Sequence, residues 1–415
     1  MSKKERLSTE AYKGVRDFYP EEQALLNYLT SVMRSVVERV GYVEYHASVL
    51  ESAELYRAKG AENEELTNEQ TYTFLDRGGR EVTLRPEMTP TVARMVAAKR
   101  RELGFPLRLY SIPNVFRYER PQKGRLREHW QLNVDLFGSR SLYADAEIIG
   151  VAYGIMRAFG AKESDFEIRL GSRNALEKLD MELINREVSS ENRKKIRVLL
   201  DKKGKMSEGE RQKELEQLAN GPFEITETAD IVEIRRILSD LGVTNATFDP
   251  NIVRGFDYYT GMIFEVFDTH PSNNRSLFGG GRYDNLTALF DDEPTPGVGF
   301  GMGDVTLRDF LAVRGLTPPY RPPTHVYVAV ATPELVGGAW ALAAELRQQG
   351  VNAALDFGER KLGDQLKTAS KHKIPYLIVV GQNEIASSNF AVRNLETGEE
   401  KTLAREQLAA FFLNL

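Results

Sequence analysis

Apolar residues recur at helical spacing from Pro20 to Val40, and Gly41 follows where a helix would stop. A second helix is predicted from Pro90 to Arg101, with Thr89 as its N-cap ahead of the proline. Runs of β-branched and aromatic residues bounded by turn signals predict strands at 42–45, 71–75, 81–84 and 166–170. The first part of the chain therefore mixes short strands with helices.

Polar and apolar side chains alternate most regularly on either side of a basic loop, in residues 116–138. Strand side chains point to opposite faces in turn, so Arg117 and Glu119 share one face. On the second strand the polar face holds Gln131, Asn133 and Asp135, and the apolar face holds Trp130, Leu132, Val134 and Leu136. If the hairpin turns about Gly124, Arg117 lies opposite Gln131. An arginine fork suits phosphate, so this hairpin is a candidate anion site. The alternative is a solvated, charged hairpin tip above a core sheet.

The rest of the chain changes rhythm twice. Residues 174–241 are helical and highly charged, which indicates an inserted helical subdomain, and glycine-rich strands return in 251–300. A cluster of prolines at 318–323 indicates a linker. Strands and helices then alternate in 326–380, which predicts a small α/β domain with partly parallel strands.

Composition narrows the class of protein. The chain has 415 residues, enough for two or three domains, and 41% hydrophobic with 28% charged residues is typical of a soluble globular protein. Zero cysteines exclude disulfides, thiolate catalysis and cysteine zinc sites. The five histidines show no metal-ligand spacing. No signal peptide and no apolar run of about 18 residues is seen, so a cytoplasmic protein without a membrane segment is expected. A net charge of −5 argues against general coating of nucleic acid but allows local basic patches.

Two further segments carry candidate binding chemistry. Glu87 and Thr89 precede the second helix, where a carboxylate can meet a ligand ammonium or simply favour the helix start. Arg254 and Tyr258 share a strand face. An arginine inside a strand needs a partner, either the adjacent Asp257 or an anionic ligand. Tyr258 and Tyr259 line an aromatic pocket or fill core.

Two glycine clusters lie further along. Residues 279–284 lack the spacing of a phosphate loop or a dinucleotide fingerprint. They indicate either close approach of backbone to a ligand or a sheet-edge bulge. In residues 297–303 glycine occupies alternate positions, which leaves one face of a strand bare for a flat group.

Taken in order, these segments resemble the histidyl-tRNA synthetase family of class II aminoacyl-tRNA synthetases. The likeness runs nearly the full length, from Lys13-Gly14-Val15-Arg16-Asp17-Phe18 onward. Residues 116–138 look like class II motif 2, and 254–259 and 279–284 are similar to the two histidine signatures. The resemblance implies an α+β fold, with an antiparallel catalytic sheet, flanking helices and a helical insertion, followed by a C-terminal α/β anticodon-binding domain.

The resemblance also implies domain limits and assembly. We expect a catalytic core in two parts, residues 1–170 and 249–318, with a helical insertion at 171–248 between them. An anticodon-binding domain is expected at residues 324–415. The resemblance implies a homodimer assembled through the N-terminal helix and strand region.

The implied reaction has two steps: L-histidine and ATP give histidyl-adenylate, and the acyl group then passes to the 3′ end of tRNA(His). Arg117 and Arg254 would be the catalytic cations at the α-phosphate. The histidine-binding residues would be Glu87, Thr89, Arg117, Gln131, Asp135, Arg254, Tyr258 and Tyr259. Those for ATP would be Arg117, Glu119 and Arg125, and those for tRNA would be Arg120, Gln122, Lys123, Arg360, Lys361 and Lys367. Mg²⁺ is expected to arrive with ATP, with no metal ligands assigned in the chain, and the adenylate phosphate is the implied base for acyl transfer.

Three positions depart from the family pattern. Thr306 stands where class II motif 3 carries an ATP-gripping arginine, and Arg308 points about 200° away on a helix. Either another cation serves the nucleotide, with Arg282 and Arg125 as candidates, or ATP binding is weakened. Ser48 replaces the motif 1 proline in the dimer region, and Asp135 replaces a longer glutamate.

Two other functions are compatible with the sequence. A non-catalytic paralogue, such as the regulatory subunit of ATP phosphoribosyltransferase, keeps this fold, and Thr306 favours it. The intact residues 254–259 and the C-terminal domain oppose it. A module that senses histidine or uncharged tRNA would need a kinase-like segment to receive the signal, and the sequence has none.

Overall fold

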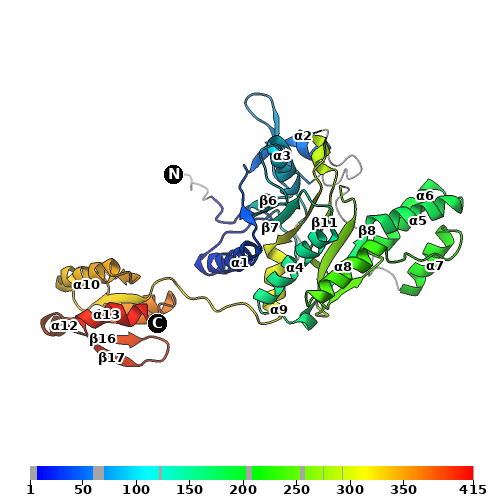
Figure 1. Cartoon of the computed structure of the whole chain (residues 1–415). Helices are drawn as coiled ribbons and strands as arrows, with labels where there is room; N and C mark the ends of the chain where they lie inside the picture. Colours follow the sequence, from blue (N-terminus) through cyan, green and yellow to red (C-terminus); the bar gives the residue numbers. More distant parts are fainter. Residues whose placement is uncertain are drawn as a thin grey trace, which may run out of the picture. The chain divides into compact units, whose positions relative to one another are not determined.

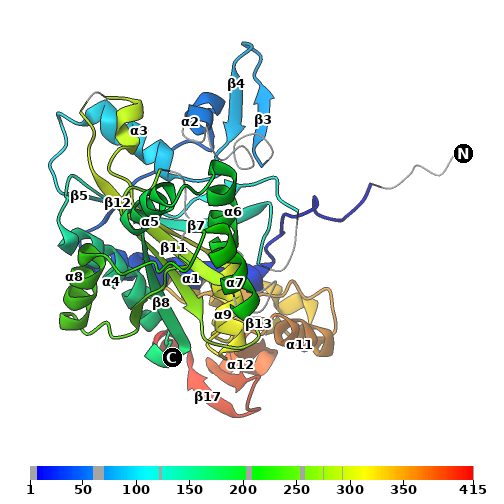
Figure 2. The same cartoon turned by 90° about the vertical axis from the view of Figure 1, so that its right-hand side faces the viewer.

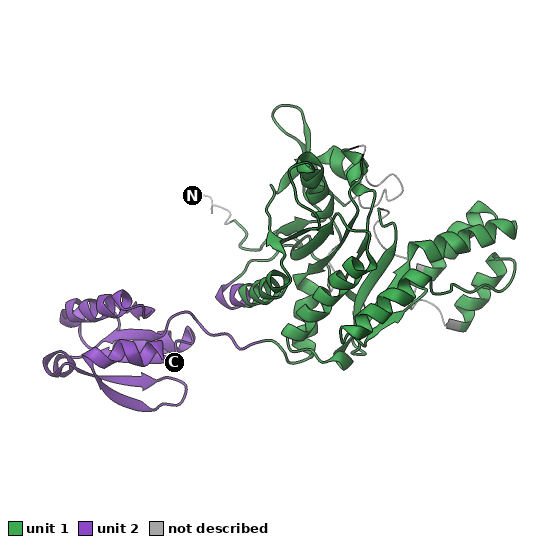
Figure 3. Ribbon diagram, viewed as in Figure 1, with its two compact units in different colours: residues 1–18, 25–317 green, residues 19–24, 318–415 purple. Residues whose placement is uncertain are grey.

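The computed structural model describes residues 7–58, 70–120, 124–201, 208–252, 258–273, 275–291 and 293–414. The chain forms two compact units, Met1–Phe18 with Leu25–Thr317 and Tyr19–Ala24 with Pro318–Leu415 (Figure 3). In the described part of the chain, no helix has the length and apolarity needed to cross a membrane.

A large, mostly antiparallel sheet organises the first unit (Figure 1). Its strand order is β1-β5-β7-β12-β11-β10-β8-β9, with β6 paired to β7. The strands are β1 (Val43–Glu44), β5 (Leu107–Ser111), β6 (Asn114–Phe116), β7 (Glu128–Phe137), β8 (Phe166–Ser172), β9 (Ala246–Phe248), β10 (Met262–Asp268), β11 (Ser276–Arg282) and β12 (Gly297–Gly303). Among the described strands of this sheet, only the outer pairs β1–β5 and β8–β9 are parallel. The predicted antiparallel sheet is confirmed.

Helices cover the apolar face of this sheet. Leu132, Val134 and Leu136 of β7 point into one core that also takes in apolar residues of the helices. The helices that supply this core are α1 (Pro20–Arg39), α4 (Leu142–Ala158), α8 (Ala229–Asp240) and α9 (Asp304–Val313). Because side chains alternate along a strand, the other face of β7 is left to its polar residues. The predicted separation of the two faces is confirmed.

A smaller sheet lies at one end of the unit, with strand order β2-β4-β3 (Figure 2). It contains β2 (Leu50–Ser52), β3 (Tyr72–Leu75) and β4 (Glu81–Leu84), beside α2 (Ala53–Ala58) and α3 (Thr89–Lys99). The strand at 81–84 is where the sequence predicts it. Thr89 is wrong as an N-cap: Met88 is the N-cap residue, and no side chain caps this helix start. The helix starts at Thr89, one residue earlier than predicted, because the first turn of a helix tolerates a proline such as Pro90.

The charged helical segment divides between two cores. The helices α5 (Arg173–Asn185), α6 (Ser190–Asp201) and α7 (Glu208–Leu218) pack around a cluster of their own that includes Leu179, Leu183 and Ile196. They extend away from the sheet beyond β8 (Figure 1). In contrast, Ile231 and Ile234 of α8 belong to the main core.

The register of the hairpin differs from the predicted one. Val115 pairs with His129, and the amide of Arg117 donates to the carbonyl of Arg127 at 2.9 Å. Arg117 therefore lies opposite Arg127 and not opposite Gln131. The predicted register was wrong by four residues. A shift by an even number of residues leaves each side chain on its face, so both residues still face the same side.

The glycine-rich strands β11 and β12 lie in the middle of the sheet. β11 pairs with β10 and with β12, so the alternative of a sheet-edge bulge is wrong. A Cβ on Gly280 would come within 2.1 Å of the carbonyl oxygen of Gly299. Glycine is therefore required by the close approach of two backbones as well as by the bare face it leaves.

The second unit is the predicted small α/β domain. Its sheet has the order β14-β13-β15-β16-β17, parallel among the first three strands and antiparallel at the last two. The strands are β13 (Val326–Val330), β14 (Ala353–Leu355), β15 (Tyr376–Val380), β16 (Asn389–Asn394) and β17 (Glu400–Ala404). The helices are α10 (Val336–Gln348), α11 (Leu362–Lys371), α12 (Gln382–Ser387) and α13 (Arg405–Leu413).

Candidate active site

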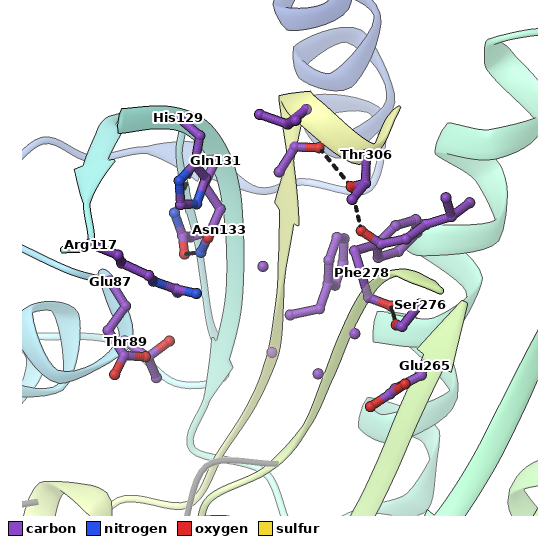
Figure 4. A pocket seen from close by; sticks show the side chains of 18 of the residues that line it. Glu87, Thr89, Arg117, His129, Gln131, Asn133, Glu265, Ser276, Phe278 and Thr306 are labelled. Atoms are coloured by element: carbon purple, nitrogen blue, oxygen red, sulfur yellow. Dashed lines mark hydrogen bonds between the residues drawn. The ribbon is translucent and has the colours of Figure 1, made fainter. Parts of the chain in front are cut away.

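A cavity of about 800 Å³ lies over the polar face of the large sheet. Residues from the hairpin, from the start of α3 and from β10, β11 and β12 line it (Figure 4). Among the predicted site residues, the lining includes Glu87, Thr89, Arg117, Glu119, Arg125, Gln131, Tyr258 and Tyr259. Segments that are far apart in the sequence thus meet at one cavity.

One wall of the cavity combines a cation with a carboxylate. The Nε atom of Arg117 donates to the carbonyl of Pro86 at 3.0 Å, and burial lowers the pKa of this guanidinium. The buried carboxylate of Glu87 accepts a hydrogen bond from the hydroxyl of Tyr258 at 3.1 Å. Arg117, Glu87 and Thr89 are on the same side in Figure 4. This wall can hold a ligand that carries both a negative and a positive group.

The polar face of β7 supplies neutral hydrogen-bonding groups to the cavity. Gln131 donates from Nε2 to the Oδ1 atom of Asn133 at 2.7 Å. Burial, followed by the charge of Arg117, lowers the pKa of His129 to about 3, so this imidazole is neutral. His129 and Asn133 were not among the predicted site residues, although Asn133 shares the alternation that identified Gln131.

Asp135 lies deeper than the other polar residues of β7. It is 1% exposed and is absent from the described lining of the cavity. The hydroxyl of Tyr283, which does line the cavity, donates to its Oδ1 atom, and its Oδ2 atom has no hydrogen-bond partner among the described residues. Burial raises the pKa of Asp135 to about 7. Tyr283, which no sequence argument identified, therefore links Asp135 to the lining of the cavity.

The floor of the cavity is bare backbone. Gly279, Gly280, Gly299, Gly301 and Gly303 all line it. A Cβ on Gly301 would lie 2.4 Å from the Nε2 atom of Gln131. The glycine thus lets the side chain of Gln131 lie over β12, and a flat group on this floor stays a prediction.

The wall opposite Arg117 is poor in positive charge. It carries Thr306, Phe278, Ser276 and Glu265 (Figure 4). The hydroxyl of Thr306 donates to the carbonyl of Leu277 at 2.6 Å, which ties the first turn of α9 to β11. The family pattern places an arginine at this position, and the side chain that stands there is neutral.

One of the two candidate replacements for that arginine, Arg282, is used elsewhere. Arg282 donates to Asp145 at 2.6 Å and pairs with Asp284 at 3.0 Å, and it does not line the cavity among the described residues. Arg282 as the second nucleotide cation was therefore wrong. Arg308 lies over the ring of Phe18, as the helix geometry predicted. Arg125 does line the cavity, and it pairs with Glu119 at 3.3 Å.

Other predicted residues lie away from this cavity or cannot be placed. Arg254, Gln122 and Lys123 fall outside the described residues. Arg120 is exposed beside the hairpin loop. Arg360, Lys361 and Lys367 are exposed in the second unit, where Arg360 pairs with Asp356 at 2.5 Å.

Comparison with known proteins identifies the family. The histidyl-tRNA synthetase family model matches residues 14–205 and 172–305, and an anticodon binding domain model matches residues 325–415. The chain belongs to the histidyl-tRNA synthetase family. It is 41% identical to the histidine–tRNA ligase of Leptospira biflexa over 426 residues, with 97% of each chain covered. It is 35% identical to that of Thermoplasma volcanium over 431 residues, with 98% of each covered.

Solved structures agree with this assignment. The histidyl-tRNA synthetase of Nostoc sp. PCC 7120 superposes with a TM-score of 0.82 at 25% identity, covering 99% of this chain and 100% of that one. A protein from Bacillus halodurans described as an ATP phosphoribosyltransferase regulatory subunit/histidyl-tRNA synthetase has a TM-score of 0.68 at 23% identity, covering 88% of this chain and 97% of that one. The latter likeness concerns the fold alone.

Proposed function

We propose that this protein activates L-histidine with ATP and transfers the histidyl group to the 3′ end of tRNA(His). The observation that carries the proposal is the position of Arg117, between a wall that suits an amino acid and a glycine floor that suits a nucleotide. Membership of the histidyl-tRNA synthetase family supports the same reaction. The protein would then be a histidine–tRNA ligase acting on ATP, histidine and tRNA.

Arg117 would act on the first step. An oxygen of the histidine carboxylate forms a bond to the α-phosphorus, and the bond from that phosphorus to the bridging oxygen breaks to release pyrophosphate. Negative charge accumulates on the phosphoryl oxygens in the transition state. A guanidinium held by the carbonyl of Pro86 at 3.0 Å is already oriented, so it stabilises that charge without reorganisation.

Histidine would bind between the polar wall and the tyrosines. Glu87, which is already hydrogen-bonded to Tyr258, would accept from the substrate ammonium together with Thr89. Gln131 would orient the substrate from β7. The imidazole would contact Tyr259 and the hydroxyl of Tyr283, with Asp135 acting through Tyr283. Glu119 and Arg125, on the hairpin, would contact the nucleotide.

Mg²⁺ would accompany ATP. No cluster of three or more possible metal ligands occurs among the described residues. Mg²⁺ is commonly held by one or two carboxylates and by substrate phosphates. Glu265 lines the cavity on the side of Thr306 and is the carboxylate we assign to it. The ion would neutralise phosphate charge there.

The tRNA would be bound by both units. The match of residues 325–415 to an anticodon binding domain supports recognition of tRNA by the second unit. Its exposed Arg360, Lys361 and Lys367 are the residues we assign to the phosphates of the anticodon region. Arg120 would meet the acceptor end. A reaction that uses ATP and tRNA supports a cytoplasmic location.

A homodimer would form through the N-terminal strands. Val43 is 64% exposed, Leu50 45% and Leu75 66%. These residues lie on β1, β2 and β3, and exposed apolar residues within one region of the chain indicate a surface that another chain covers. One chain has a mass of 46.9 kDa, and light scattering on the purified protein is expected to give twice that mass. Leu50→Asp together with Leu75→Asp should shift the mass towards one chain, and a monomeric parent protein would contradict the proposal.

The proposed reaction is tested by pyrophosphate exchange. With ATP and Mg²⁺, the protein is expected to exchange labelled pyrophosphate into ATP only when L-histidine is present. Charging of tRNA(His) should follow with the same amino-acid requirement. A folded protein without histidine-dependent exchange would instead favour the non-catalytic paralogue, the alternative that Thr306 supports.

A further inference from the structure

Among the described residues, the nucleotide half of the cavity carries little positive charge for a triphosphate. ATP with one Mg²⁺ still carries net negative charge, and phosphate oxygens removed from water need charge-assisted hydrogen bonds. Among the described lining residues the only arginines are Arg117 and Arg125. We have assigned Arg117 to the reacting phosphate, and Arg125 pairs with Glu119 at 3.3 Å. The wall formed by Thr306 and Phe278 therefore needs a cation from outside the lining.

Arg275 stands beside this wall. A Cβ built on Gly124 would lie 3.9 Å from the Nη1 atom of Arg275 and also 3.9 Å from the Cγ2 atom of Thr306. The guanidinium of Arg275, the side chain of Thr306 and the hairpin loop at Gly124 thus surround one small volume. Gly124 and Thr306 both line the cavity, so this volume borders it.

The position of Arg275 in the fold places it next to residues that line the cavity. It directly precedes β11, whose first residues Ser276 and Leu277 line the cavity. The hydroxyl of Thr306 donates to the carbonyl of Leu277 at 2.6 Å, which fixes α9 beside this end of the strand. Arg275 is exposed, and the long side chain of an arginine carries its guanidinium far from the backbone.

We propose that Arg275 supplies the cation for the β- and γ-phosphates of ATP, in the space that an arginine at position 306 would otherwise fill. The inference rests on the proposed function, because it takes ATP as the ligand. An arginine fork binds two phosphate oxygens at once, and an exposed one binds them with little desolvation. Arg275, directly before β11, would thus bind the phosphates that an arginine at position 306 of α9 would otherwise bind.

The experiment combines loss of Arg275 with its replacement from α9. Arg275→Ala is expected to raise the KM for ATP in histidine-dependent pyrophosphate exchange by about 10- to 100-fold, the range for a lost charged hydrogen bond. The KM for histidine should change by less than about twofold, because the histidine wall is untouched. Arg275→Lys should lie between parent and Arg275→Ala, since an ammonium cannot bind two oxygens in the same way.

The decisive variant is Arg275→Ala with Thr306→Arg. Because Thr306 and Arg275 border the same volume, the new arginine should lower the KM for ATP back towards the parent value. If Arg275 only stabilised the loop structure, an arginine at position 306 would not lower the raised KM for ATP. Arg101→Ala, which removes an exposed arginine that does not line the cavity, serves as the matched control and should leave both KM values unchanged.

Each outcome decides the inference. An unchanged KM for ATP in Arg275→Ala, or a raised one that Thr306→Arg does not lower, would overturn it. If Arg275→Ala loses its fold, Arg275→Gln keeps the stem of the side chain and tests the same charge. If the parent shows no histidine-dependent exchange, the proposed function fails, and calorimetric binding of ATP to the same variants still tests Arg275.

Discussion

Replacing Arg117 with alanine is expected to lower kcat/KM for histidine-dependent pyrophosphate exchange by about 10²- to 10³-fold, the range for losing one preorganised donor to transition-state charge. Arg117 is oriented by the carbonyl of Pro86 and faces the cavity from the end of β6. The loss should fall mainly on kcat, because the charge that Arg117 meets develops during the reaction. Steady-state exchange at saturating ATP and histidine measures this effect.

Arg117→Lys separates charge from geometry. Lysine keeps the positive charge but lacks the fork, so it should recover only part of the activity. Arg108→Ala is the matched control: Arg108 pairs with Glu147 at 2.7 Å outside the cavity, and its loss should affect stability more than exchange. Equal kcat values for Arg117→Ala and the parent would remove Arg117 from the reacting centre.

The faces of the hairpin could be predicted from the sequence, but its register could not. Alternation along β7 identifies Gln131 and Asn133 as one face and Leu132 as the other, because the period of a strand is fixed by its backbone. Register depends on how many residues the loop takes up, and Gly124 alone did not specify that number. Residues 117 and 131 still reach the same cavity because the error was even.

Pairs that form across the fold were beyond sequence reasoning. The hydroxyl of Tyr283 reaches Asp135 because β11 and β7 flank β12 in the sheet. Nothing near Asp135 in the sequence marks Tyr283 as its partner. In the same way, Arg282 was a candidate for the nucleotide until its ion pair with Asp145 placed it elsewhere. The sequence identifies the residue types of a site, and the topology decides which of them meet.

Asp135→Asn is expected to stabilise the folded protein at neutral and alkaline pH while weakening histidine binding. Burial raises the pKa of Asp135 from 3.8 to about 7, so its ionised form destabilises the fold by roughly 4 kcal/mol above pH 7. Asparagine carries no charge, and its carbonyl still accepts from Tyr283. Urea unfolding at a series of pH values, together with the KM for histidine, measures both effects.

The sign of the pH dependence separates this account from simple loss of a contact. The folded state binds a proton at Asp135 that the unfolded state releases between pH 4 and about 7, so the parent should lose stability as pH rises through that range. Asp135→Asn should lack this loss and should match the parent most closely below pH 4.

Asp76 provides the opposite case, because hydrogen bonds from Arg80 lower its pKa. Asp76→Asn should therefore destabilise the protein at neutral pH and match the parent in acid. A carboxylate that costs stability and lies behind a lining tyrosine is what a site built for ligand recognition would retain. If Asp135→Asn left the pH dependence of unfolding unchanged, burial of the Asp135 carboxylate would not destabilise the fold, and this account of Asp135 would be wrong.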